Sequence, residues 1–168
     1  MRLTAQIGEF EMDEVILDLG SEVNVLTKKT WEQMGIPKLA RSPIHLWLAN
    51  QQRVSPLGRL PQVPVDIDGI RSFADFEVIE IIGDSRLYPA LLGINWEFEN
   101  MVVIDLKKIQ MTFEDKYIWV ITPLDPFQGP RYIEPIRAKE EVRNMESLYQ
   151  MTANQSDYIN PTVEGNIS

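Results

Sequence analysis

Cysteine is absent from the 168-residue sequence, and histidine occurs once, at His45. Without cysteine the chain has no disulfide scaffold, zinc ribbon, iron–sulfur cluster or cysteine nucleophile. A single histidine excludes most histidine-based metal sites, and a Ser–His–Asp mechanism would depend on His45 alone. We therefore expect neither a metal ion nor a cofactor.

Positive charge and long apolar runs are also scarce. The 16 Lys and Arg stand against 25 Asp and Glu, and the formal net charge of −9 argues against contact with nucleic acid. No stretch reaches the roughly 18 apolar residues that a membrane span needs. Residues 1–14 lack the apolar segment of a signal peptide. We expect a soluble, cytoplasmic protein with no membrane or nucleic-acid partner.

The composition changes near residue 122. All four Trp precede this point, whereas a proline-rich and then polar run follows it. Too few large apolar side chains remain there to offset the entropy of ordering the chain. We predict one folded domain over residues 1–122 and a mostly disordered tail over residues 123–168. Within the tail, residues 137–151 carry a loose helical stripe that favours a short helix.

Alternation of apolar and polar side chains dominates the first 122 residues and predicts many short strands. Two short helices are expected, one at residues 28–34 between a Thr27 cap and Gly35, and one at residues 95–99. Short strands separated by Pro and Gly are typical of an all-β barrel or sandwich. The predicted strands are residues 2–7, 12–17, 44–48, 63–67, 74–78, 102–106 and 109–113, the last two joined by a tight Lys107–Lys108 hairpin.

The most informative segment is VILDLGS, in which an apolar strand runs directly into Asp18. An Asp at the end of a buried strand costs free energy unless it is hydrogen-bonded or paired. Gly20 lets the backbone turn sharply and approach another chain or a ligand. On this segment alone, a structural role for Asp18 as the cap of a turn is favoured. A second segment, residues 88–96 (YPALLGINW), is a core strand that Gly93 ends before a helix begins.

The order of these segments resembles a known family. ILDLGSEVNVL is followed by KKTWEQMG, IHLWLANQQRVSPLG, ALLGINW and VVIDLKKIQMTF. This order is similar to that of the retropepsin-like aspartic proteases in the polyproteins of gypsy-type LTR retrotransposons, and also to the DNA-damage-inducible-type aspartyl proteases. The resemblance covers about residues 2–120. It implies a small closed acid-protease barrel, a symmetric homodimer, and hydrolysis of an extended peptide or polyprotein substrate.

The resemblance also assigns roles to individual residues. It makes Asp18 the catalytic residue, followed by the active-site loop. It places substrate binding just after this loop and at the tip of a flap over residues 45–58, and it places bracing residues behind the loop. The loop residues are Leu19, Gly20 and Ser21; the substrate-binding residues are Glu22, Ala49, Asn50 and Gln51; the bracing residues are Leu92, Gly93 and Asn95.

A single catalytic Asp implies two chains. Peptide hydrolysis by this chemistry needs two carboxylates that share one proton, because like charges about 3 Å apart cannot both ionise. The nearest second motif, Asp66–Gly69, is better interpreted as a turn between two strands. One motif in a half-sized chain therefore predicts that Asp18 pairs with its symmetry mate in a homodimer.

Two alternatives stay open. Leu19 stands where the family has Thr or Ser, whose hydroxyl bonds across the dimer, and Leu has neither donor nor acceptor. The chain could thus be a catalytically impaired retropepsin-like fold that acts as a remnant or binding module. It could also be an unrelated small β domain that binds a protein partner through its acidic surface and the helix predicted in the tail.

Four other polar residues have more ordinary interpretations. His45 is expected at the exposed base of the flap. The carboxylates of Glu77 and Glu80 are expected on a solvated strand face. Asp105, beside a Lys-Lys turn, is expected to have a capping or ion-pair role.

Overall fold

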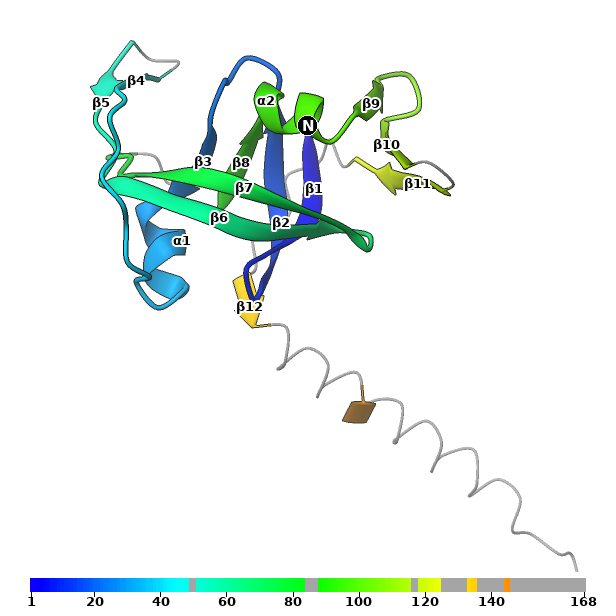
Figure 1. Cartoon of the computed structure of the whole chain (residues 1–168), viewed down its shortest axis with the longest axis horizontal. Helices are drawn as coiled ribbons and strands as arrows, with labels where there is room; N and C mark the ends of the chain where they lie inside the picture. The colour runs from blue at the N-terminus through cyan, green and yellow to red at the C-terminus, as the bar shows by residue number, and fades with distance from the viewer. Residues whose placement is uncertain (49–50, 84–87, 116–117, 125–132, 136–143, 146–168) are drawn as a thin grey trace, which may run out of the picture. The chain divides into compact units, whose positions relative to one another are not determined.

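The computed structural model describes residues 1–48, 51–83, 88–115, 118–124, 133–135 and 144–145. Met1–Glu134 form one compact unit and Pro135–Ser168 a second. Figure 1 shows the strands and the two short helices along the chain. The elements are β1 (Arg2–Ile7), β2 (Phe10–Asp18), β3 (Asn24–Thr27), α1 (Lys28–Gln33), β4 (Leu46–Trp47), β5 (Arg53–Val54), β6 (Gly58–Ile67), β7 (Ile70–Ile79), β8 (Ala90–Gly93), α2 (Ile94–Glu99), β9 (Val102–Asp105), β10 (Gln110–Asp115), β11 (Ile118–Pro123) and β12 (Ile133–Pro135).

Six of the strands close into a barrel. They are hydrogen-bonded in the order β1-β6-β7-β3-β8-β2, and β1 also pairs with β2. The β2–β8 and β3–β7 pairs are parallel, whereas the remaining pairs of the barrel are antiparallel. The predicted all-β class and small closed barrel are confirmed. The core is apolar, and its largest fully buried side chains include Trp96, Phe76, Ile7, Met12 and Leu26.

Turn chemistry accounts for the long β6–β7 hairpin. Asp68 and Gly69 both have positive φ, of 50° and 86°, as a two-residue hairpin turn requires. Asp66 Oδ1 accepts a hydrogen bond from Gly69 N at 2.9 Å. Side chains of β6 then alternate, so that Val63, Val65 and Ile67 are buried. This segment is a turn, as predicted.

The two helices begin where the sequence predicts. Thr27 caps α1, and its hydroxyl accepts a hydrogen bond from Thr30 N at 3.3 Å. The chain then turns at Gly35, whose φ is 89°. Helix α2 follows β8 directly, and its Trp96 is 2% exposed and packs edge-on against Phe113.

A smaller sheet in the order β11-β10-β9 follows α2. Asp105 Oδ1 accepts hydrogen bonds from the backbone N of Lys107 and of Lys108, at 2.9 and 3.0 Å, which confirms its capping role. The sequence did not predict β11, which pairs along its whole length with β10. Exposed Trp119, Ile121 and Pro123 alternate with the less exposed Val120 and Thr122, and the strand begins five residues beyond the end predicted for the preceding strand.

The remaining sequence predictions concern the end of the chain. Of the helix predicted over residues 137–151, the structure describes only Asn144 and Met145, which are helical. The disordered tail from residue 123 stays a prediction. Among the described residues, no helix has the length and apolar character to cross a membrane.

Candidate active site

Asp18 is the last residue of β2 and pairs in parallel register with Gly93 of β8. One of its carboxylate oxygens, Oδ1, accepts a hydrogen bond from Gly20 N at 2.9 Å. Its carbonyl oxygen accepts another from Ser21 N at 3.1 Å. The carboxylate is thus oriented by its own loop, while Oδ2 takes no hydrogen bond from the described part of the chain. The residue is half-buried and remains accessible.

The end of β8 packs closely against the backbone of this loop. A Cβ added to Gly93 would lie 2.5 Å from Ser21 O and 2.7 Å from Val23 O, closer than any side chain allows. Ile94 N donates to Ser21 O at 2.8 Å, and Gly93 N donates to Asn24 Oδ1 at 2.9 Å. Only glycine permits this approach, and the approach fixes the loop that carries Asp18.

The other bracing residues occupy the same region. Asn95, at the start of α2, donates from Nδ2 to Glu22 O at 2.8 Å. Leu92 is fully buried and pairs with Leu17 in the ladder that ends at Asp18. The structure therefore brings Leu92, Gly93 and Asn95 together with the Asp18 loop.

The loop residues differ in what they contact. Ser21 Oγ donates to Val23 O at 2.8 Å, so this hydroxyl is engaged within its own loop. Leu19 is 50% exposed. Glu22 is exposed immediately after the loop.

The flap is a short hairpin of β4 and β5. Strand β4 covers only Leu46–Trp47, and is therefore shorter than the strand predicted at residues 44–48. Leu48 N donates to Gln52 O at 2.9 Å, and Gln51 turns the chain with a φ of 67°. Ala49 and Asn50, predicted to bind substrate, lie outside the described residues. The apolar side of the hairpin packs on Val25, Ile79 and Leu91 through Leu46, Leu48 and Val54.

Two side chains of the hairpin point to solvent. His45 is exposed, as expected at the base of the flap, and its Nδ1 lies 2.9 Å from Ser55 Oγ. Trp47 is 70% exposed. These side chains are therefore accessible to a molecule that approaches the flap.

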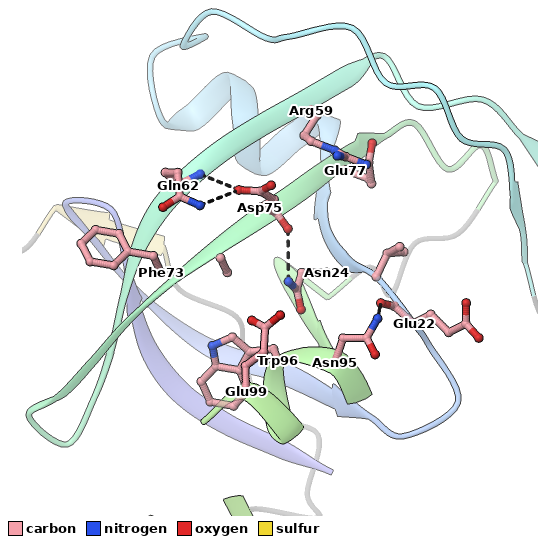
Figure 2. Close-up of a pocket in the computed structure, with 12 residues that line it drawn as sticks. Glu22, Asn24, Arg59, Gln62, Phe73, Asp75, Glu77, Asn95, Trp96 and Glu99 are labelled. Atoms are coloured by element: carbon pink, nitrogen blue, oxygen red, sulfur yellow. Dashed lines mark hydrogen bonds and ion pairs between the residues drawn. The ribbon is translucent and has the colours of Figure 1, made fainter. Parts of the chain in front are cut away.

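A cavity of about 250 Å³ is lined by Glu22 and Asn95 on one side and by residues of β6 and β7 on the other (Figure 2). Asn24 spans it, because its Nδ2 donates to Asp75 O at 3.1 Å while its Oδ1 holds Gly93 N. Asp75 Oδ1 also accepts from Gln62 N at 2.8 Å. The cavity wall thus ties the hairpin of the barrel to the active-site loop. Other lining residues are Arg59, Phe73, Glu77, Trp96 and Glu99.

The expectation that Glu77 lies on a solvated face is wrong. Its side chain is buried, and Oε1 pairs with Arg59 Nε at 2.6 Å. Toward the end of β7 both faces are covered, so that residues 76–79 are all buried and the alternation ceases. Glu80, one residue beyond the strand, is exposed as expected and pairs with Lys28 Nζ at 2.9 Å.

Sequence reasoning missed Glu97 of α2. Its side chain is 5% exposed, and neither carboxylate oxygen has a hydrogen-bond partner among the described residues. Burial raises the pKa of Glu97, and the charge of Asp18 raises it further, whereas the amino group of Met1 acts in the opposite direction. The sequence signal for this environment is faint: one Glu in the mostly apolar run ALLGINWEF.

The side chains that the structure describes hold no group of three His, Cys, Asp or Glu placed to bind a metal ion. The candidate site consists of one oriented carboxylate, its loop and the flap.

The chain was compared with known proteins by sequence and by structure. No family model and no curated protein matches the sequence. Among solved structures, the retroviral protease-like domain of Ddi1 from Leishmania major is similar, with a TM-score of 0.58 and 21% sequence identity over 75% of this chain and 94% of that one. The chain has a retroviral protease-like fold. The origin in a gypsy-type retrotransposon stays a prediction.

Proposed function

We propose that this chain is an aspartic endopeptidase that works as a homodimer, with Asp18 of each copy forming the catalytic pair. The observation that carries this proposal is the Asp18 loop: a carboxylate at a strand end, oriented by Gly20 N and braced by Gly93, within a retroviral protease-like fold. One chain supplies one such carboxylate.

The chemistry follows from two carboxylates that share a proton. The ionised Asp takes a proton from water as the water attacks the scissile carbonyl, and the protonated Asp hydrogen-bonds to the carbonyl oxygen. The peptide lies extended beneath the flap and pairs with main-chain groups as an added strand. Glu22 and Gln51 line its path. Polyprotein segments are the substrate class that the family resemblance implies.

The small sheet supports association with a second copy. Val103, Thr112 and Ile121 lie in register across its three strands, on one face. Val103, Ile121 and Trp119 on this face are between 55% and 69% exposed. Burying these exposed apolar side chains against a symmetry mate removes them from water. Leu19 and Phe98, at 50% and 73% exposed, are further apolar groups that a partner would cover.

Leu19 supports a second candidate, a retroviral protease-like fold that binds peptides or proteins without cleaving them. A Leu pair at the junction of two catalytic loops makes apolar contact instead of hydrogen bonds. Apolar contact fixes the relative orientation of the two loops less well than hydrogen bonds do. Each buried backbone donor that lacks an acceptor there destabilises the dimer by about 1–3 kcal/mol.

A peptide-cleavage assay between about pH 4 and 6 distinguishes the two candidates. The enzyme proposal expects cleavage by the wild type that is lost in Asp18→Asn and kept in Asp66→Asn, a matched change in the β6–β7 turn. Cleavage that survives Asp18→Asn would contradict it. No cleavage by the wild type, with cleavage gained in Leu19→Thr, would establish the second candidate instead.

A further inference from the structure

Glu97 is a buried carboxylate without the hydrogen-bond partners that such a group usually has. Helix α2 starts directly after Gly93, the residue that pairs with Asp18, so Glu97 lies one helical turn from the active-site ladder. Its side chain is 5% exposed, and both carboxylate oxygens lack a hydrogen-bond partner within the described residues. Buried polar groups in native proteins are nearly always hydrogen-bonded, and an exception of this kind needs an explanation.

Two charges act on Glu97 from the elements around it. Asp18, at the end of β2, has the same sign, and the amino group of Met1, ahead of β1, has the opposite sign. Leu17 N donates to Met1 O at 3.0 Å, which places Met1 beside the end of β2. Glu99, on the same helix, is exposed, and residues two apart on a helix do not face each other. Burial and Asp18 together therefore favour the protonated form of Glu97.

We propose that Glu97 is a positioning residue that supports the Asp18 loop only while it carries its proton, so that its ionisation ends activity as the pH rises. This inference rests on the proposed function, and it adds a pH limit that comes from a residue outside the catalytic pair.

The link to the loop runs through the first turn of α2. An ionised Glu97 would be a buried carboxylate without a hydrogen-bond donor, and the like charge of Asp18 would repel it. Water can solvate this carboxylate only if α2 moves away from the barrel. The first turn of α2 also holds the loop, through Ile94 N to Ser21 O and Asn95 Nδ2 to Glu22 O, both at 2.8 Å. Movement of α2 therefore loosens the segment that orients Asp18.

Unfolding by urea at a series of pH values tests the coupling without any substrate. The pKa of Glu97 is higher in the folded than in the unfolded chain, so its favourable contribution is present below the unfolded value of about 4.3 and is lost as the pH rises through the folded value. Glu97→Gln should thus gain stability over the wild type as the pH rises. Glu99→Gln, which removes the same charge from the exposed face, should follow the wild type. Parallel curves for wild type and Glu97→Gln would overturn the inference.

A double-mutant cycle assigns the effect to Asp18. Asp18→Asn should reduce the loss of stability at rising pH in the wild-type background and have no such effect in Glu97→Gln. An equal effect in both backgrounds would overturn the coupling. Glu97→Met provides the same comparison if the Gln variant does not fold. This cycle holds whether or not the chain cleaves peptides, so it separates this inference from the proposed function.

The pH profile of peptide cleavage tests the positioning role itself. In Glu97→Gln the alkaline limb of kcat/KM should move to higher pH, whereas in Glu99→Gln it should stay in place. A merely structural Glu97 would change stability and leave this limb unmoved, and that result would refute the positioning role.

Discussion

Replacement of Gly93 by Ala probes the contact that fixes the active-site loop. The added methyl group would lie 2.5 Å from Ser21 O and 2.7 Å from Val23 O. Both neighbours are backbone atoms, so a change of side-chain rotamer cannot relieve the clash. The strand end or the loop must therefore move.

The loss of stability in Gly93→Ala has two sources, overpacking and weakened hydrogen bonds. Overpacking of a tight site costs about 1–3 kcal/mol. Separating β8 from the loop also weakens the hydrogen bonds from Ile94 N to Ser21 O and from Gly93 N to Asn24 Oδ1, each contributing about 1 kcal/mol. We expect Gly93→Ala to lower the free energy of unfolding by roughly 3–5 kcal/mol, a large part of the total for a small domain.

Urea unfolding followed by tryptophan fluorescence measures this loss, because Trp96 is buried two residues into α2. Gly20→Ala is the matched control in the same site. Its Cβ would meet only the side-chain Oδ1 of Asp18, at 3.2 Å, and we expect a loss of about 1 kcal/mol or less. A Gly93→Ala variant as stable as Gly20→Ala would refute the account of the loop.

Three further changes are predicted from individual side-chain contacts. Asn24→Ala removes both the acceptor for Gly93 N and the donor to Asp75 O, and should lower the free energy of unfolding by about 1–3 kcal/mol. Asn24→Asp keeps the acceptor but sets a carboxylate oxygen against Asp75 O, so it should lower the free energy of unfolding as well. Arg59→Met leaves Glu77 buried beside no cation and should cost about 3 kcal/mol by urea unfolding, whereas the same change at exposed Arg71 should be close to neutral. Hydrogen bonds from turn N–H groups, that of Lys108 first, lower the pKa of Asp105, so its stabilising contribution is present above the unfolded value and is lost as the pH falls. Acid-unfolding curves of Asp105→Asn should therefore depend less steeply on pH than those of the wild type.

Local patterns predicted the turns and the helix cap well, because each of these features is complete within a few residues. The β6–β7 turn, the Thr27 cap and the Asp105 turn each depend on hydrogen bonds between near neighbours. The closure of the strands into a barrel was expected from a resemblance in the order of motifs. The bracing of Ser21 by Gly93 joins residues far apart in sequence, and it too was expected from that resemblance.

The errors arise where tertiary contacts override local patterning. Glu77 alternates as a surface residue would, yet the end of β7 is covered on both faces and Arg59 provides its charge partner. Glu97 stands in a short helix among mostly apolar residues, and its burial depends on the packing of α2 against the rest of the fold, which the local sequence does not reveal. Strand β11 stays in register with β10 although it lies where the composition already changes.

The central claim is that one active site takes Asp18 from two chains, and a mixing experiment tests it directly. Increasing amounts of Asp18→Asn protein are added to a fixed amount of wild type, and peptide cleavage is measured at acid pH. Mixed dimers hold one carboxylate, so the account predicts that cleavage falls toward zero as the variant is added in excess. Cleavage that is unaffected by the variant, or a wild type that cleaves nothing, would contradict the claim.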